Sequence, residues 1–354
     1  MICKERKKSQ ATFNVNTIEG LANLPQHLAN LDSEPFAIMN TAHEEGRILI
    51  FASRPGLEFL ETCATWSGDG TFRTSTKFFA QIYFIMGQST NEHSKFVPIV
   101  FCLLPNKRAS TYQLVFETLK RYVKKGPETF MIDFEIGVKT EFEKQFPETD
   151  VRGCYFHFVY NVLKQVKNKG GQLDLRNNIS FSIAISHVKA LAFLPSDQVN
   201  AAYETIVRPM LLDSVANKEM AISVCNYLEH TYMGKRRTRK NITAPLFSPS
   251  MWSHHQSVVG DSVRVLTNNS QECFNRVWNN TLAKSPNVGS VIAGFQREAR
   301  LMCDTLREVR TYCPENNNVQ RKKKNARYDQ INKILQRLNT ANTSIVLGDI
   351  ARLV

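Results

Sequence analysis

The stretch TWSGDGTFRTS, from Thr65 to Ser75, decides the fold, because it places one carboxylate, Asp69, between Gly68 and Gly70. Asp-Gly is a strong hairpin signal, so this stretch taken alone predicts a turn. The apolar stretch FFAQIYFIMG begins a few residues later, and it predicts a buried strand. Asp69 is therefore either a turn residue or an acid at the start of a core sheet.

Strand-like and helix-like segments follow each other around this stretch. In chain order, they predict strands at 71–75, 78–86 and 96–104, a helix at 110–126, a strand at 130–133, a helix at 137–146 and a strand at 151–158. Three antiparallel strands followed by crossovers into parallel strands are the layout of a ribonuclease H-like mixed sheet. The predicted fold class is therefore α/β, although several α/β folds share parts of this order.

From about residue 159 to residue 232 the strand signals are replaced by helical patterns, which predict an all-helical insertion. The basic loop KRRTRK follows it. The predicted organisation is an N-terminal region over 1–60, a first core segment over 61–165, the helical insertion over 166–260, a last core segment over 261–285 and a basic helical tail over 286–354.

The segment NSQECFNRVWNNTL, Asn269–Leu282, predicts an amphipathic helix in the last core segment. Its apolar side chains recur at i, i+3, i+4 and i+8, at Phe274, Val277, Trp278 and Leu282. On the opposite face we expect Glu272, Arg276 and Asn279.

The composition points to an intracellular protein that meets polyanions. The chain has 354 residues, a formal net charge of +13 and a pI near 9.4, so nucleic acid is the first candidate partner. The eight cysteines are scattered without a Cys-x-x-Cys pair, which predicts reduced thiols. The apolar runs are too short for a membrane span, so no membrane partner is expected.

Three acids stand out by position: Asp69, Asp133 at the end of the apolar run FMID, and Glu272 on a polar helix face. Each has a structural alternative, namely a turn, a helix cap and an exposed helix charge respectively. In a ribonuclease H-like layout, however, the first strand, the fourth strand and a late helix bring such acids together. Three carboxylates can hold two Mg²⁺ or Mn²⁺ ions about 4 Å apart for phosphoryl transfer.

Four motifs in order, TWSGDGTF, FMIDFE, RGCYFHFVYNV and TNNSQECFNRVW, resemble Mutator-like element (MULE) transposases, a DDE family with a ribonuclease H-like core. The likeness extends from about Ile48 to Leu282. It implies that Asp69, Asp133 and Glu272 bind two Mg²⁺ or Mn²⁺ ions. The implied activity cleaves DNA at transposon ends and joins the 3′-hydroxyl to target DNA. Glu229, in YLEHTY, is the alternative to Glu272.

The family's Cys-x-x-His falls on Cys154 and His157. By resemblance, this pair lies beside the active site. Two alternatives remain open: half of a zinc site, which needs four ligands, or a core thiol beside a core histidine.

Several residues are candidates for DNA contacts. The basic loop can follow phosphates or act as a nuclear localisation signal, or it can be a solvated charge run; the basic segment QRKKKNAR has the same alternatives. Trp252 can stack on an unpaired base or pack in a core. The predicted DNA-contacting residues are Lys235, Arg236, Arg237, Arg239, Lys240, Arg276 and Trp252.

The expected location is the nucleus, and the expected state is a homodimer or larger oligomer on DNA. The first sixty residues lack zinc-finger spacing, whereas the family usually carries a separate recognition domain there. A catalytically silent, host-adopted DNA-binding derivative is therefore the alternative function, and another ribonuclease H-like nuclease is a third. We expect Gly68 and Gly70 to leave space beside the carboxylate for metal and DNA backbone.

Overall fold

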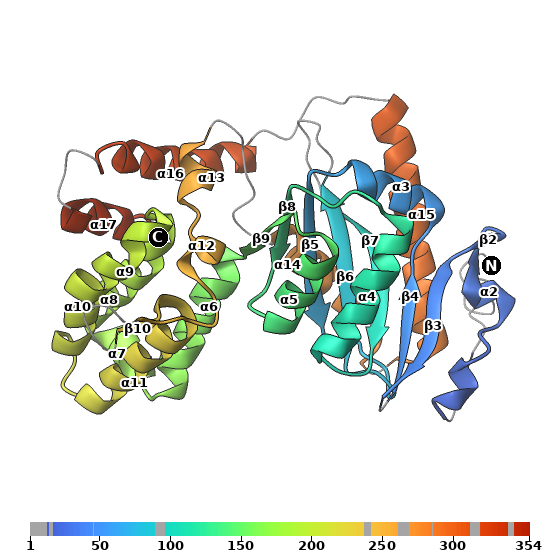
Figure 1. The fold of residues 1–354 in the computed structure, drawn as a ribbon, viewed down its shortest axis with the longest axis horizontal. Helices are drawn as coiled ribbons and strands as arrows, with labels where there is room; N and C mark the ends of the chain where they lie inside the picture. Colours follow the sequence, from blue (N-terminus) through green and yellow to red (C-terminus); the bar gives the residue numbers. More distant parts are fainter. Residues whose placement is uncertain are drawn as a thin grey trace, which may run out of the picture. The chain divides into compact units, whose positions relative to one another are not determined.

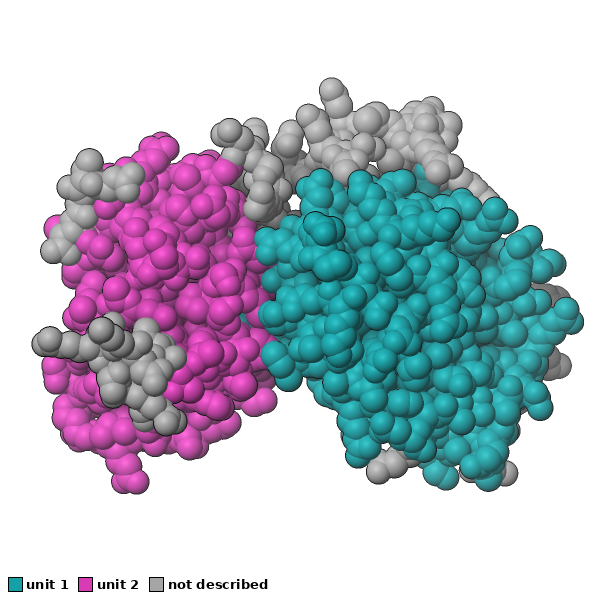
Figure 2. All heavy atoms as spheres, in the orientation of Figure 1, with its two compact units in different colours: residues 1–151, 268–314 teal, residues 152–267, 315–354 magenta. Residues whose placement is uncertain are grey.

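The computed structural model describes residues 13, 17–44, 46–88, 96–236, 242–260, 269–284, 286–311, 319–338 and 343–354. The chain divides into two compact units (Figure 2). Unit 1 comprises residues 1–151 and 268–314, and unit 2 comprises residues 152–267 and 315–354. Unit 1 thus includes the segment predicted as a separate N-terminal region, and the predicted tail is divided between the two units.

A mixed sheet forms the centre of unit 1 (Figure 1). Its strands are β3 (Ala37–His43), β4 (Gly46–Phe51), β5 (Thr65–Thr71), β6 (Gln81–Gln88), β7 (Phe96–Leu104), β8 (Thr129–Ile132) and β9 (Asp150–Gly153), in the spatial order β3-β4-β7-β6-β5-β8-β9. Strands β5, β6 and β7 pair antiparallel, and β5 pairs with β8 in parallel. The predicted ribonuclease H-like α/β class is confirmed.

Helices cover both faces of this sheet (Figure 1). The main helices of unit 1 are α3 (Arg54–Thr62), α4 (Ala109–Tyr122), α5 (Ile136–Gln145), α14 (Asn269–Thr281) and α15 (Val288–Thr311). Short elements precede the sheet: η1 (Glu19–Leu21), α2 (Gln26–Ala29), β1 (Asn30–Leu31) and β2 (Glu34–Pro35).

Alternate side chains of β6 show which helices cover which face. Phe84 lies against Trp278 of α14, with ring centroids 5.4 Å apart, and against Phe295 of α15. Its neighbour Tyr83 points the other way and meets Tyr112 of α4 at 5.5 Å. Because successive side chains of a strand point to opposite faces, a central strand buried on both sides is apolar throughout. This explains the uninterrupted run that the sequence showed after Asp69.

Strand β5 runs through the Asp-Gly pair, so the turn alternative for Asp69 is wrong. Residue 69 is opposite Phe84 of β6 within an unbroken antiparallel ladder. The strand predicted at 71–75 was misplaced, because β5 ends at Thr71. The hairpin signal is local, and pairing with a strand on each side overrides it.

The two glycines of β5 allow close packing on the face of the sheet opposite to the Asp69 side chain. A Cβ at Gly68 would lie 2.3 Å from Tyr83 Oη, and one at Gly70 would lie 2.5 Å from Gln81 Oε1. Both neighbours are buried side chains of β6. The glycines therefore make room for large side chains of the adjacent strand. That they also leave space for metal and DNA stays a prediction.

The strand predicted at 151–158 is also wrong beyond its first half. Strand β9 ends at Gly153, and α6 (Tyr155–Asn168) begins with Cys154 at its N-cap. The buried side chains of α6 are Phe158, Val162 and Val166, and this spacing of four is helical. The apolar run CYFHF had concealed this period.

Unit 2 is helical, as predicted for most of it. Its helices are α6, α7 (Gln172–Asn177), α8 (Ile179–Ala190), η2 (Leu191–Phe193), α9 (Ser196–Ala202), η3 (Tyr203–Val207), α10 (Arg208–Asp213), α11 (Lys218–Leu228), η4 (Glu229–Met233), α12 (Pro249–Trp252), α13 (His255–Val259), α16 (Val319–Leu335) and α17 (Thr343–Ala351). Two short strands, β10 (Lys235–Arg236) and β11 (Ile242–Thr243), pair antiparallel. Among the described residues of the whole chain, no helix combines the length and hydropathy needed to span a bilayer.

We expect Gly68→Ala to lower the free energy of unfolding by about 1–3 kcal/mol, as overpacking does. The added methyl group would meet Tyr83 Oη at 2.3 Å and Phe130 Cζ at 2.7 Å. Adding Tyr83→Phe should restore part of the loss, because it removes the nearer atom. Urea denaturation of the single and double variants measures both effects, and equal stability of Gly68→Ala and the parent chain would contradict the packing explanation.

Candidate active site

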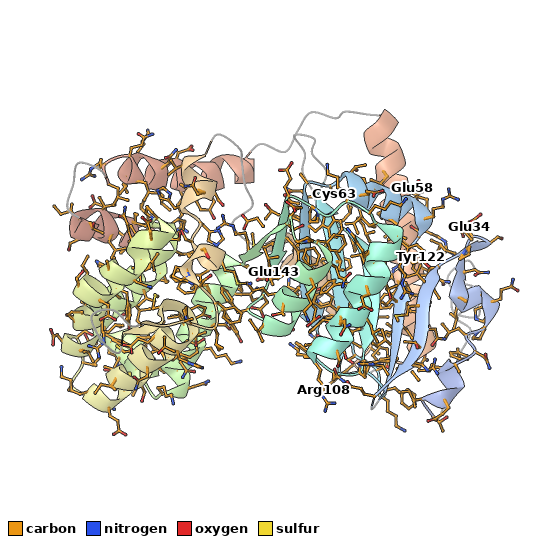
Figure 3. All side chains as sticks on the ribbon, in the orientation of Figure 1. Glu34, Glu58, Cys63, Arg108, Tyr122 and Glu143 are labelled. Atoms are coloured by element: carbon orange, nitrogen blue, oxygen red, sulfur yellow. The ribbon has the colours of Figure 1, made fainter. Side chains whose placement is uncertain are left out.

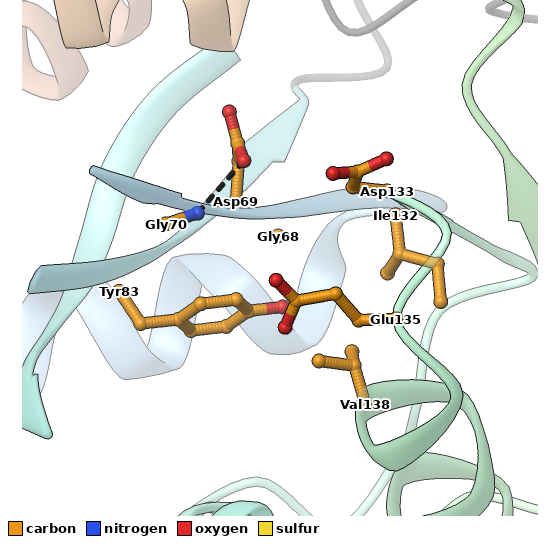
Figure 4. A pocket seen from close by; sticks show the side chains of 8 residues that line it. All are labelled: Gly68, Asp69, Gly70, Tyr83, Ile132, Asp133, Glu135 and Val138. Atoms are coloured by element: carbon orange, nitrogen blue, oxygen red, sulfur yellow. Dashed lines mark hydrogen bonds between the residues drawn. The ribbon is translucent and has the colours of Figure 1, made fainter. Parts of the chain in front are cut away.

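Three secondary-structure elements bring the predicted acids to one region of unit 1. Asp69 lies within β5, Asp133 directly follows β8, and Glu272 is in the first turn of α14. In the parallel pairing of β5 and β8, Gly68 is opposite Ile132, so Asp69 and Asp133 are the next residues on neighbouring strands. Figure 4 shows both carboxylates on the same side of β5.

The acids interact electrostatically. Burial, with smaller contributions from the charges of Asp133 and Glu272, raises the pKa of Asp69 to about 8, although the hydrogen bond from the Gly70 N–H acts in the opposite direction. Burial also raises the pKa of Glu272 to about 7, with a second contribution from Asp133. Asp133 is therefore close enough to Asp69 and to Glu272 for its charge to disfavour the ionisation of both. A bound cation would reverse this effect.

A row of hydrogen bonds fixes α14 along β5. Three amide side chains spaced by four residues meet three side chains spaced by two: Gln271 with Ser67, Asn275 with Asp69, and Asn279 with Thr71. Four residues of helix rise about 6 Å, and two residues of strand advance about 6.6 Å. The two elements therefore stay in step over the whole row, which we call the amide ladder.

The central contact of the amide ladder holds the candidate ligand itself. Asn275 Nδ2 donates to Asp69 Oδ2 at 2.8 Å, and the Gly70 N–H donates to Oδ1, also at 2.8 Å. These donors orient the carboxylate and leave its remaining lone pairs for another ligand. Asn275 Oδ1 is buried and has no hydrogen-bond partner among the described residues.

The donor atoms suit a hard divalent cation. The charge of Asp133 raises the pKa of both Asp69 and Glu272, and oxygen ligands are those that Mg²⁺ and Mn²⁺ prefer. Asn275 Oδ1 adds a buried oxygen without a partner beside Asp69. On this chemistry, the residues present fit a divalent metal.

A small hollow of about 180 Å³, open to solvent, lies beside the two aspartates (Figure 4). Its lining is Gly68, Asp69, Gly70, Tyr83, Ile132, Asp133, Glu135 and Val138. The hollow is too small for a nucleotide, so it accounts for ions or water next to the carboxylates and not for a whole substrate.

Glu135 is a member of this region that the sequence did not single out. Tyr112 Oη donates to its Oε2 at 2.6 Å, and Lys107 forms an ion pair with its Oε1. The N–H of Glu135 donates to the carbonyl of Asp133 at 2.9 Å. Glu135 thus anchors the loop that carries Asp133. In the sequence Glu135 is visible only as the second acid of DFE, three residues before the first buried apolar residue of α5. Nothing in the local sequence indicated that its partners are Tyr112 and Lys107.

Asp133 does not cap α5, which was its structural alternative. The N-cap position of α5 is Glu135, and no side chain caps that end. Asp133 Oδ1 instead accepts from the N–H of Phe134, at 2.6 Å.

The faces of α14 differ from the prediction at two positions. Phe274 and Leu282 pack against the core and Trp278 is buried, as predicted, but Val277 is 54% exposed. Asn279 faces β5 in the amide ladder and not the opposite side. Helical periodicity located the apolar stripe, but it did not show that a neighbouring polar stripe was also packed.

Other candidate residues lie in unit 2. Glu229 is buried there and accepts from Arg208 Nε at 3.0 Å, so it is part of that unit's own interior. Cys154 and His157 lie at the start of α6; Cys154 is buried and His157 is partly buried. This placement fits the expectation of a buried core thiol and leaves the role of the pair a prediction.

Trp252 is fully buried and stacks on Phe158, with ring centroids 4.8 Å apart. The prediction that it stacks on a base is therefore wrong, and its packing alternative holds. Arg276 is exposed on α14, and Lys235 and Arg236 form β10. Arg237, Arg239 and Lys240 lie outside the described residues.

The protein has a ribonuclease H-like sheet with a cluster of carboxyl groups beside the central strand β5. Residues 65–161 match the family model of the MULE transposase domain. These residues are therefore similar to a MULE transposase domain, as the motifs predicted. The matched range includes Asp69 and Asp133, and Glu272 follows it.

A curated protein with a similar segment is also a transposase. The transposase for insertion sequence element IS1201 of Lactobacillus helveticus is 23% identical over 86 residues, which cover 24% of this chain and 23% of the relative. The chain thus matches about a quarter of that protein's length.

Removing the central contact of the amide ladder should loosen α14. We expect Asn275→Ala to lower the free energy of unfolding by about 1–3 kcal/mol, because it removes the side-chain donor of the partly buried Asp69 carboxylate. Asn280→Ala is the matched control, since Asn280 is exposed on the same helix. Chemical denaturation measures both, and an equal effect of the two variants would contradict the ladder's importance.

The raised pKa of Asp69 predicts a pH dependence of stability without metal. The folded chain keeps this proton up to about pH 8, whereas the unfolded chain releases it near the ordinary aspartate pKa of 3.8. Between these values the folded state binds more protons, so the free energy of unfolding falls as pH rises. We expect Asp69→Asn to gain about 1–3 kcal/mol relative to the parent between about pH 5 and pH 8.

Urea denaturation in chelator at both pH values measures this difference. Asp213→Asn is the control, because Asp213 is an exposed residue of α10. The same pH slope for Asp69→Asn and the parent chain would contradict the raised pKa of the Asp69 carboxyl group.

Proposed function

We propose that this chain is the catalytic core of a DDE transposase. It would cleave phosphodiester bonds at transposon ends and transfer the freed 3′-hydroxyl to target DNA. The proposal rests on one observation: β5, β8 and α14 bring Asp69, Asp133 and Glu272 close enough to interact electrostatically. The charge of Asp133 raises the pKa of Asp69 and of Glu272, and the charge of Glu272 raises the pKa of Asp69. Clustered anions that destabilise one another are typical of functional sites.

In this proposal Asp69, Asp133 and Glu272 hold two Mg²⁺ or Mn²⁺ ions. Bound ions of this kind activate the attacking oxygen and stabilise the leaving oxygen of a phosphoryl transfer. The chain's own residues supply the geometry: Asn275 orients the Asp69 carboxylate, and Glu135 anchors the loop of Asp133. Neither step requires a serine or cysteine nucleophile.

The proposed partners are transposon ends and target DNA, met by a homodimer or larger oligomer in the nucleus. The net charge of +13 supports a polyanionic partner. A second candidate is a silent derivative that binds DNA without cutting it. The presence of all three acids, with Asp69 held by specific donors, favours the enzyme.

The test uses the purified chain, pre-nicked or hairpin DNA with a labelled strand, and Mn²⁺ or Mg²⁺. We expect metal-dependent cleavage or joining by the parent chain and a loss of about 10²-fold or more with Asp133→Asn, since a ligand of the reacting centre is removed. Asp213→Asn, on the exposed side of α10, should retain full activity.

Two results would defeat the proposal. One is the absence of any metal-dependent product with the parent chain, which together with DNA binding would favour the silent derivative. The other is equal activity of Asp133→Asn and the parent, which would place the chemistry elsewhere.

A further inference from the structure

The positive charge of this protein is concentrated in one of its units. Unit 2 has 22 Lys and Arg against 10 Asp and Glu, a formal net charge of +12, whereas unit 1 has 23 against 22, a net charge of +1. The field that attracts polyanions therefore belongs to the helical unit. The unit with the carboxylate cluster contributes almost nothing to it.

Helix α6 of unit 2 displays two aromatic rings at its surface. Phe156 is 44% exposed and Tyr160 is 51% exposed. One helical turn apart, their rings lie nearly parallel, with centroids 6.4 Å apart and planes 11° apart. Lys164, a further turn along, places its Nζ 5.9 Å from the centre of the Tyr160 ring. Exposed Lys167 follows. We call Phe156, Tyr160, Lys164 and Lys167 the α6 stripe.

The core does not require these rings. Helix α6 is anchored by Phe158, Val162 and Val166, all fully buried. Polar residues in place of Phe156 and Tyr160 would leave the buried face of α6 unchanged. Exposed aromatic surface is unfavourable in water. Their parallel arrangement with cations at one end is the combination that binds nucleic acid, since rings stack on bases and lysines contact phosphates.

We propose that the α6 stripe is a stacking surface for unpaired bases of single-stranded DNA. The rings of Phe156 and Tyr160 receive the bases, and Lys164 and Lys167 contact the backbone. A duplex hides its bases within the stack, so it would meet only the lysines. This proposal adds a DNA-contacting surface to the proposed function. It rests on that function in one respect, because only a transposase activity identifies DNA, and not RNA, as the natural ligand.

The test measures binding of the full chain to a labelled oligothymidine of about 16 nucleotides by fluorescence anisotropy, in chelator and without metal. We expect Tyr160→Ala and Phe156→Ala each to weaken binding about 10-fold, and to leave binding of a duplex within about twofold of the parent. Tyr160→Phe keeps the ring and should bind within about twofold of the parent. Lys164→Gln should reduce the slope of log affinity against log salt by about 0.7.

Tyr122→Ala is the matched aromatic control. Tyr122 is 49% exposed at the end of α4 in unit 1 (Figure 3), and its loss should not change binding. Phe156→Trp provides a second measurement in an intact surface, because stacked bases should quench its indole fluorescence as oligothymidine is added.

Three outcomes would overturn the proposal: unchanged affinity of both alanine variants together with no quenching of Phe156→Trp, equal losses for single strand and duplex, or a change of oligomeric state in the alanine variants with unchanged DNA affinity. The last would make the α6 stripe a contact between copies. Because the assay excludes metal, failure here with intact Asp133-dependent cleavage would leave the proposed function standing. Stacking without cleavage would favour the silent derivative.

Discussion

The hydrogen bond from Asn275 to Asp69 is the contact on which the candidate site depends. It joins residues 206 positions apart, so the short connection of a hairpin or a crossover does not impose it. The chain leaves unit 1 within β9, forms most of unit 2 and only then returns to unit 1, where it forms α14. The position of α14 along β5 must therefore be set by side chains, and the matched steps of the amide ladder do this.

Packing and polarity act together in that contact. Trp278 and Phe274 attach α14 to the apolar core, which supplies most of the attraction but little registry. The amides supply registry, because a shift by one helical turn would leave buried donors and acceptors unpaired. A buried polar row next to an apolar stripe thus makes the position of Glu272 specific. The electrostatic repulsion between the acids opposes this arrangement, and the packing and hydrogen bonds of α14 against β5 must offset it.

Much of this could be predicted from local sequence. The strand at 96–104 was located with its bounds, the helix of α14 nearly so, and the three acids were selected by their order along a ribonuclease H-like chain. Three of the failures have a common cause. Gly68 is explained by Tyr83 across the sheet, Asn279 by Thr71, and Glu135 by Tyr112. Each partner is remote in sequence, and neither periodicity nor turn rules carry information about such pairs.

The order of the chain also has a consequence for its synthesis. A ribosome releases Asp69 and Asp133 first, then the helical segment with most of the positive charge of unit 2, and Glu272 after them. A nascent or prematurely terminated chain would thus carry two of the three carboxylates and a basic helical segment, but lack the last acid. The carboxylate cluster can therefore be completed only after the insertion has been translated, because the third carboxylate follows it in the chain.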